Sequence, residues 1–203
     1  MREKKGHRGI IGSYLLRLVK LTERWGVSSR DLFEGLSLRP EDLEDPSMIV
    51  PPTIGIELVE RVRRLTREPA LGFHFGLETS ISAHGYLSFA AMSSSTLGQA
   101  LELSIRYSLI RTSALSLRLT VKGDRAVLDA EEREDLGSAR DVFLLGMLVG
   151  TWQIGNALLG RVVPESTVHL TLREPAWYQR FRDVDPRVRF GQAANQLSST
   201  QLC

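Results

Sequence analysis

The stretch between residues 140 and 159, RDVFLLGMLVGTWQIGNALL, has no charged side chain after Asp141 and strongly constrains the fold. Its apolar residues lie on every side of a helix of 3.6 residues per turn, which is typical of a helix buried at the centre of a protein. Ser138, followed by Asp141 three residues later, is a helix-start signal. Gly146 and Gly150, four residues apart, would let a second element approach closely. The sequence therefore predicts a central buried helix here.

Before this helix, the spacing at which apolar residues recur changes from about 3.6 residues, as in a helix, to two residues, as in a strand. Leucine or valine alternates with polar side chains over residues 115–121, Gly123-Asp124 provides a turn, and the chain returns over 125–131. This pattern predicts a β-hairpin with one buried face. Later segments at residues 166–172, 187–191 and 195–199 also have strand character, and PAWYQRFRD between the first two predicts a short helix.

The first 80 residues have helical patterns instead. Gly26 suits a helix end, Ser28 with Asp31 suits a helix start, and Thr53 is a candidate cap for the helix that follows it. Four prolines between residues 40 and 52 indicate a connector with one short helical turn. The arginines on the helix after Thr53 are interpreted as a solvated basic face; they are Arg61, Arg63, Arg64 and Arg67.

The order of these elements predicts an α+β fold. An N-terminal helical lobe of about residues 10–80 is followed, over about 81–200, by a small antiparallel sheet packed on the long buried helix. Residues 1–9 are expected to form a flexible basic tail, so that residues 10–203 form the folded domain.

Composition narrows the classes of protein that remain. The net charge of +2 is too balanced to imply nucleic-acid binding by itself. The longest apolar run, residues 142–152, is shorter than the roughly 20 residues that cross a membrane, so no membrane span is expected. The single cysteine, Cys203, excludes an intramolecular disulfide and fits a reducing cytoplasm. The sequence contains no cofactor motif, and we expect no cofactor to bind.

Catalytic and metal-binding patterns are weak. The four histidines, at positions 7, 74, 84 and 169, are scattered, so no metal site is expected. The serines at 93–95 near His84 leave open a small serine hydrolase, as a remote alternative. However, Thr96 with Gln99 three residues later forms a capping box, and serines at a helix boundary commonly cap free amides. We therefore expect no enzymatic activity.

The helix predicted over residues 96–111 has two different sides. Gln99, Glu102 and Arg106 form a polar stripe that faces solvent, so Ser104, Ser108 and Arg111 point inward. Inward polar groups need partners. Those partners are either backbone groups, with Arg111 reaching outward, or a bound ligand. In the second case the predicted lining residues are Tyr107, Arg111, Ser104, Ser108, Phe89, Met92, Phe143, Met147 and Trp152.

Several segments resemble the regulatory domain of one branch of the AraC/XylS family of bacterial transcription regulators, the branch with an arabinose-binding-like N-terminal domain. The resemblance rests on PALG at 69–72, GYL at 85–87, STLGQAL at 95–101 and RY at 106–107. It continues with RFG at 189–191 and NQL at 195–197, and covers about residues 10–197. Each motif is moderately specific, whereas their common order and spacing are fairly strong.

The resemblance implies a cytoplasmic, homodimerising domain that binds a small metabolite such as an amino acid or a fatty acid. In the family this domain precedes a pair of helix-turn-helix units that bind DNA. Those units are expected beyond Cys203, outside this chain, so DNA would be bound only through them. A dimerisation or interaction module without a ligand pocket is the alternative.

Overall fold

Two compact units make up the chain, and each combines segments that are far apart in sequence. Unit 1 contains Met1–Pro69, Ser108–Ser116 and Glu132–Arg140, and unit 2 contains Ala70–Tyr107, Leu117–Glu131 and Asp141–Cys203. The computed structural model describes residues 9–80, 93, 94, 96, 98–100, 102, 103, 105, 106, 112–123, 125–162, 165–184 and 186–200.

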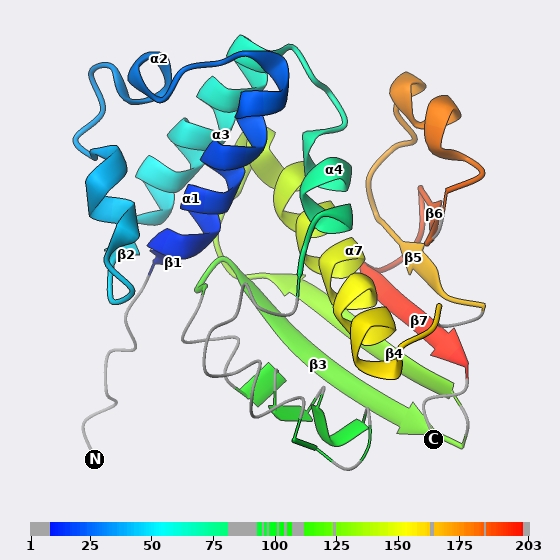
Figure 1. Cartoon of the computed structure of the whole chain (residues 1–203). Helices are drawn as coiled ribbons and strands as arrows, with labels where there is room; N and C mark the ends of the chain where they lie inside the picture. Colours follow the sequence, from blue (N-terminus) through cyan, green and yellow to red (C-terminus); the bar gives the residue numbers. More distant parts are fainter. Residues whose placement is uncertain are drawn as a thin grey trace. The chain divides into compact units, whose positions relative to one another are not determined.

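Unit 1 is mainly helical (Figure 1). Its elements are β1 (Ile10–Ile11), α1 (Gly12–Leu21), η1 (Thr22–Trp25), α2 (Ser29–Phe33), η2 (Pro40–Glu44), β2 (Ile49–Val50), α3 (Pro52–Thr66) and η4 (Gly137–Ala139), where η denotes a 3-10 helix. The strands β1 and β2 pair antiparallel, with Ile10 opposite Val50. Sequence patterns missed both strands because two residues are too few to show an alternation.

Local signals set most of the helix ends in unit 1. The Ser28 hydroxyl accepts a hydrogen bond from the Asp31 amide at 3.2 Å, which confirms the predicted start of α2. Gly26 ends η1 with a left-handed φ of 69°, a conformation that glycine adopts without strain. The prediction for Thr53 is wrong, because α3 begins at Pro52 with Pro51 before it. Proline suits the first turn of a helix, where no amide hydrogen is needed.

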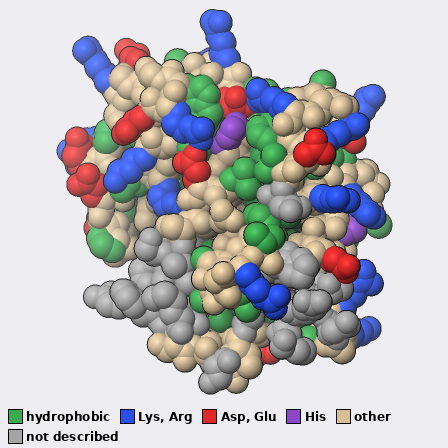
Figure 2. Space-filling view, turned by 45° about the vertical axis from the view of Figure 1, so that its right-hand side comes forward, with side chains coloured by type: hydrophobic (Ala, Val, Ile, Leu, Met, Phe, Trp, Pro, Cys, Tyr) green, Lys and Arg blue, Asp and Glu red, His purple; other side chains and the backbone are tan. Residues whose placement is uncertain are grey.

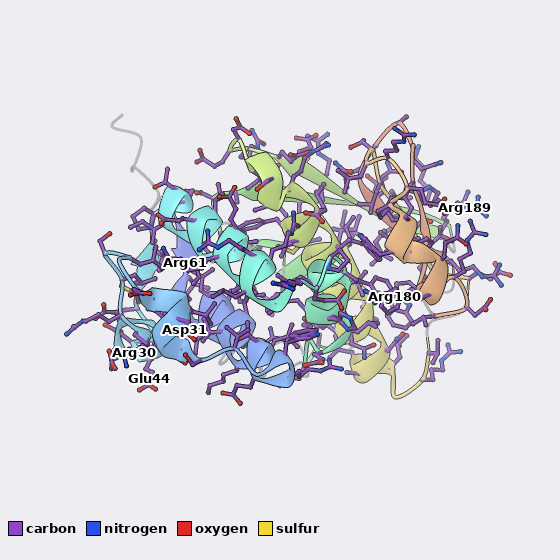
Figure 3. All side chains as sticks on the ribbon, turned by 90° about the horizontal axis from the view of Figure 1, so that it is seen from above. Arg30, Asp31, Glu44, Arg61, Arg180 and Arg189 are labelled. Atoms are coloured by element: carbon purple, nitrogen blue, oxygen red, sulfur yellow. The ribbon has the colours of Figure 1, made fainter. Side chains whose placement is uncertain are left out.

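The arginines of α3 do more than face solvent. Arg61 donates hydrogen bonds to the carbonyls of Leu32, at 3.2 Å, and of Glu34, where α2 ends (Figure 3). Arg63 donates to the Ser138 carbonyl at 2.8 Å. The interpretation of a uniformly solvated basic face is therefore wrong, because Arg61 satisfies carbonyls at the C-terminal end of α2 and Arg63 binds a carbonyl of η4.

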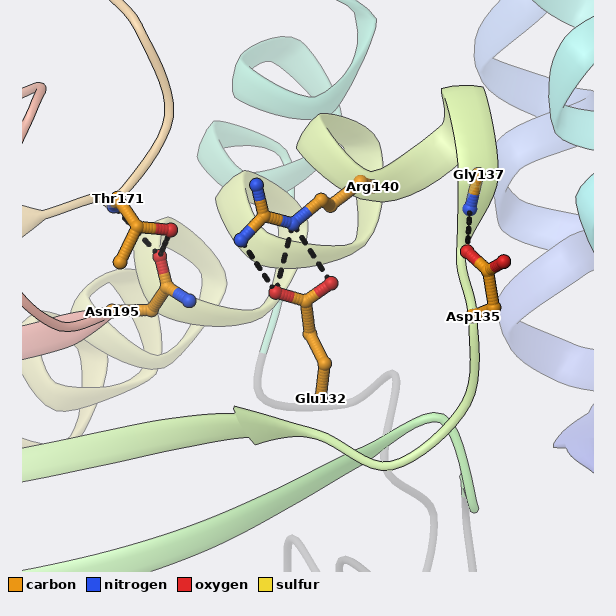
Figure 4. Close-up of polar contacts among 6 residues, drawn as sticks. All are labelled: Glu132, Asp135, Gly137, Arg140, Thr171 and Asn195. Carbon is orange, nitrogen blue, oxygen red and sulfur yellow. Dashed lines mark hydrogen bonds and ion pairs between the residues drawn. The ribbon is translucent and has the colours of Figure 1, made fainter.

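The start of the long helix also differs from the prediction. A turn of 3-10 helix, η4, precedes it, and α7 runs from Arg140 to Leu159. Ser138 does not cap α7, because its hydroxyl donates instead to the carboxylate of Glu60 on α3. The Nε–H of Arg140 is shared by both carboxylate oxygens of Glu132, at 2.8 Å from each, and Arg140 Nη2 lies 2.8 Å from Glu132 Oε1 (Figure 4). This ion pair raises the pKa of the Arg140 guanidinium through its hydrogen bonds and its charge.

The sheet has five strands in the order β3-β4-β7-β5-β6. The strands are β3 (Leu115–Lys122), β4 (Arg125–Glu132), β5 (Thr167–His169), β6 (Arg187–Arg189) and β7 (Gln196–Thr200), and unit 2 also contains α4 (Leu71–Leu77), η5 (Ala176–Phe181) and most of α7. This arrangement confirms the α+β class, and α7 runs across the sheet in Figure 1.

The sheet is mixed rather than purely antiparallel. β7 pairs antiparallel with both β4 and β5, whereas β5 and β6 pair parallel, with Val168 opposite Val188. The parallel pair arises because the connection through η5 crosses over and enters β6 in the same direction as β5. Along β3 the predicted inward face weakens toward the turn, since Leu115 is 1% exposed but Val121 is 47% exposed.

Candidate functional site

α7 presents three flanks within unit 2, and the first contacts α4. A Cβ built on Gly72 would lie 2.6 Å from Val142 Cα, and one built on Gly76 would lie 2.6 Å from Val149 Cβ. From the other helix, a Cβ on Gly150 would lie 3.0 Å from Thr79 Oγ1. Glycines on both helices thus permit the close approach that the spacing of Gly146 and Gly150 predicts.

The second flank, which we call the buried flank, consists of Leu144, Leu148 and Trp152, each one helical turn after the last. Leu144 and Leu148 are fully buried, and Trp152 is 7% exposed. Its polar atom is buried too: Trp152 Nε1 has no hydrogen-bond acceptor among the described residues. A buried indole N–H is a donor that normally has a partner.

The third flank is apolar but only half-buried. It contains Phe143, Met147, Ile154 and Leu158. Of the three α7 residues predicted to line a pocket, Phe143 and Met147 thus lie together here, whereas Trp152 lies about 140° or more around the helix axis. The structure therefore does not bring these three side chains onto one face. The four residues from Phe143 to Met147 make about one helical turn, whereas the five residues from Met147 to Trp152 go well beyond one turn.

The other polar side chains near Trp152 already have partners. Thr151 Oγ1 donates to the Met147 carbonyl at 2.8 Å, and Gln153 Nε2 donates to the Leu77 carbonyl at 3.0 Å. Asn156 Nδ2 donates to Gln153 Oε1 at 3.4 Å. Trp152 therefore differs from these three neighbours, because its donor has no acceptor within the described ranges.

The remaining predicted pocket residues lie outside the described part of the chain. They are Tyr107, Arg111, Ser104, Ser108, Phe89 and Met92. Their helix is described in part. Thr96 Oγ1 accepts from the Gln99 amide at 3.2 Å, which confirms the predicted cap. Gln99, Glu102 and Arg106 are exposed, as the predicted solvent stripe requires, and Ala100 is 2% exposed.

A serine–histidine pair that the sequence did not indicate lies on the sheet. Ser198 Oγ on β7 is 3.3 Å from His169 Nε2 on β5, and the same hydroxyl is 3.3 Å from the Thr167 carbonyl that it donates to. The nearby carboxylate of Asp129 accepts from Gln196 instead, at 2.6 Å. Among the described residues no carboxylate is hydrogen-bonded to His169, so the pair lacks the orienting acid of a catalytic triad. His84 and Ser95 lie outside those residues.

Buried polar groups elsewhere in unit 2 have structural partners. Asn195, in the NQL motif, accepts with Oδ1 from both the amide and the hydroxyl of Thr171, at 2.9 and 3.1 Å (Figure 4). The Tyr178 hydroxyl accepts from the Val188 amide at 2.8 Å. Burial raises the pKa of Tyr178, while that hydrogen bond acts in the opposite direction. Within the described ranges, no three His, Cys, Asp or Glu side chains group as metal ligands.

Charges are mixed on the visible surface. On the face shown in Figure 2, Lys and Arg side chains are interspersed with Asp and Glu side chains. Arg180 and Arg189 are exposed at the η5 and β6 end of unit 2 (Figure 3).

One segment has the length and composition of a membrane span. It is Gly137–Leu159, which contains η4 and α7, and half of its most apolar window is buried inside the protein. Its close contacts with α4 are those of a core helix.

Comparison with known proteins assigns a family to this arrangement. Residues 26–201 match the family described as the arabinose-binding domain of AraC transcription regulator, N-term. The ornithine utilization regulator of Pseudomonas aeruginosa is 31% identical over 182 residues, which cover 90% of this chain and 52% of that protein. An uncharacterized HTH-type transcriptional regulator of Mycobacterium tuberculosis is 26% identical over 187 residues, which cover 89% of this chain and 54% of that protein.

A solved structure supports the fold. The transcriptional regulator CdpR from Pseudomonas aeruginosa superposes with a TM-score of 0.54 at 14% identity, over 93% of this chain and 55% of that one. The chain thus spans about half the length of the relatives it matches.

Proposed function

The chain belongs to the family of arabinose-binding-type N-terminal domains of AraC transcription regulators, and from this premise we propose that it senses a small metabolite. The family consists of regulatory domains, not enzymes. The observation that carries the proposal is the family match over residues 26–201, together with a buried donor on the central helix of that domain that has no acceptor among the described residues.

The proposed effector site uses the buried flank of α7 and the helix predicted over residues 96–111. Trp152 would supply a hydrogen bond there, whereas Phe143 and Met147, predicted from the sequence to line the same pocket, lie about 140° or more away around α7 and outside this site. The polar residues would be Ser104, Ser108 and Arg111, with Tyr107 beside them and Phe89 and Met92 completing the apolar lining. Such a site, mostly apolar with a few polar groups, is typical of small-molecule pockets.

The proposed partners follow from the length of the relatives. Because each of them is about twice as long as the matched region, we propose that this domain acts together with a DNA-binding region of the helix-turn-helix type. DNA would be bound through that region only. We further propose that the domain forms a homodimer and works in the cytoplasm, where a bacterial regulator meets DNA.

A thermal-shift screen of this chain tests the proposal. The panel contains L-ornithine, because one relative is an ornithine utilization regulator, with other amino acids and fatty acids. A ligand at 100 times its Kd adds about 2.7 kcal/mol of stability, which raises the Tm of a 200-residue domain by roughly 5–10 °C. No shift with any metabolite would count against sensing and favour an interaction module.

A pair of arginine variants tests whether Arg111 is the anchor, meaning the residue whose guanidinium group binds the effector. Arg111→Ala is expected to weaken binding of a positive ligand from the screen at least tenfold, because it removes a charge-assisted hydrogen bond. Arg106→Ala, on the exposed stripe of the same helix, is the matched control and should bind normally. Equal affinities for the two variants would show that Arg111 is not the anchor.

A further inference from the structure

The indole of Trp152, on α7 in unit 2, is a buried donor. The side chain is 7% exposed, its Nε1 atom is inaccessible to water, and no acceptor lies within hydrogen-bond distance in the described part of the chain. More than nine in ten buried polar groups have a partner, and burial of a lone donor is unfavourable. A buried donor of this kind therefore requires an explanation.

The helix itself offers no acceptor. No backbone carbonyl of α7 and neither of the side-chain oxygens of Thr151 and Gln153 is a hydrogen-bond partner of Trp152 Nε1. The other members of the buried flank, Leu144 and Leu148, are hydrocarbon. An acceptor for Trp152 must come from outside this helix.

An ordered water fits this place poorly. A buried water normally makes about three hydrogen bonds to polar groups. Within the buried flank only Trp152 has a polar side chain, because the other two members are leucines. A ligand that carries one oxygen on an apolar body matches one donor beside hydrocarbon far better.

We propose that Trp152 Nε1–H donates the hydrogen bond that orients the effector, and that the acceptor is a carbonyl or carboxylate oxygen on an apolar chain. This inference rests on the proposed function and adds the chemical class of the ligand. The indole only donates, so a protonated amine cannot occupy the same position. The leucines of the buried flank would contact the apolar part of the ligand.

Three probes with the same eight-carbon chain test the class: octanamide, octanoate and octylamine. They present a neutral acceptor, an anionic acceptor and a cation without an acceptor. Binding is measured by calorimetry on this chain, on Trp152→Phe and on Trp177→Phe. The control residue, Trp177, is half-buried and packs on Tyr178 and Phe181 in η5. Phenylalanine retains an aromatic ring but removes the donor.

The expected result separates the two variants. Trp152→Phe should bind octanamide or octanoate about tenfold more weakly, because the acceptor loses its donor. Trp177→Phe should change this affinity by less than about twofold. Octylamine should bind with no dependence on Trp152, or not at all. The difference between octanamide and octanoate identifies whether the neutral or the charged oxygen is preferred.

An independent measurement avoids reliance on the folding of a variant. The chain contains three tryptophans, so protein labelled with ¹⁵N-tryptophan gives three indole N–H resonances, which Trp→Phe variants assign. The Trp152 resonance should move downfield when the acceptor probe binds. It should stay in place with octylamine.

Several outcomes would overturn the inference. Probe binding that neither moves the Trp152 resonance nor depends on Trp152 would leave the proposed sensing function standing and remove this residue from it. A Trp152 resonance that is already downfield without probe would show a water or another constant acceptor. Failure of both octanamide and octanoate to bind would exclude this ligand class, while the metabolite screen decides the proposed function separately.

Discussion

Arg61 and Arg64 lie on the same helix, α3, but they have different environments. Arg61 has a side-chain exposure of 15% and donates to two carbonyls at the end of α2, whereas Arg64 is exposed. Arg61 also lies 3.5 Å from the Glu57 carboxylate. The sequence shows arginines in both places, and only the fold shows which one holds a helix end.

We therefore expect unequal effects of two similar substitutions. Arg61→Ala should lower the free energy of unfolding by about 1–3 kcal/mol, because it leaves the part-buried Leu32 carbonyl without this donor. Arg64→Ala should change it by less than about 0.5 kcal/mol, as is usual for an exposed residue. Urea denaturation monitored by circular dichroism measures both. Equal losses would contradict the role assigned to Arg61.

Residue-level predictions succeeded where the partner is close in sequence. Ser28 with Asp31 and Thr96 with Gln99 are caps within one turn, so the sequence contains both partners side by side. Ser138 and Thr53 had equally good local signals and failed. The Ser138 hydroxyl donates to Glu60, which is distant in sequence. Thr53 is not a cap because α3 already begins at Pro52.

Elements pack in unit 2 through the glycines of α4 and α7. A Cβ on Gly72 would meet Val142 Cα at 2.6 Å and the carbonyl of Asp141 at 3.0 Å, both of them backbone atoms. Backbone atoms cannot move aside as a flexible side chain can. The contact therefore fixes how closely the two helices approach.

Two Gly→Ala variants test this packing. Gly72→Ala should destabilise the chain by about 1–3 kcal/mol or more, because the added methyl group forces the helices apart. Gly98→Ala is the matched control: its Cβ would meet nothing nearer than Thr96 Oγ1 at 3.8 Å, so alanine should stabilise the helix by about 0.5–1 kcal/mol. Thermal unfolding distinguishes the two, and a neutral Gly72→Ala would contradict the packing.

A second element-level prediction concerns Tyr178, which holds β6. Burial raises the pKa of this phenol above its value of about 10 in the unfolded chain. The folded state thus binds the proton more tightly, so its stabilising contribution is complete below about pH 10 and is lost as the pH rises through the raised pKa.

The variant Tyr178→Phe should remove that alkaline loss and also the acceptor of the Val188 amide. We expect the variant to be less stable than the wild type by about 1–3 kcal/mol near pH 8, because it lacks the hydrogen bond from the Val188 amide. Its difference from the wild type should shrink in parallel urea titrations as the pH rises above about 10, because only the wild type then loses the contribution of the raised pKa. A constant difference over this pH range would show that Tyr178 does not ionise during unfolding.

At the scale of elements, periodicity predicted the long segments and missed the short ones. The uncharged helix α7 and the hairpin of β3 and β4 follow from patterns that extend over many residues. β1 and β2 contain two residues each, and the parallel pairing of β5 with β6 depends on the path of the chain through η5. Neither property is encoded in a local pattern.

The whole molecule combines a family assignment with an unassigned ligand. Motifs spread from Pro69 to Leu197 indicate the family from the amino-acid sequence alone, and the match over residues 26–201 confirms it. The candidate site is harder to predict, because the burial of each side of a helix depends on the elements that pack against it. Trp152 illustrates this: its spacing from Phe143 and Met147 places it on another side of the helix, but only the fold shows that this side is buried and the other half-buried.

The most direct test of metabolite sensing is isothermal titration of this chain with the metabolite that gives the largest thermal shift. We predict saturable binding of one molecule per chain, weakened about tenfold or more by both Arg111→Ala and Trp152→Phe and unchanged by Arg106→Ala and Trp177→Phe. Absence of saturable binding to every amino acid and fatty acid in the screen would contradict the central claim that this domain senses a small metabolite.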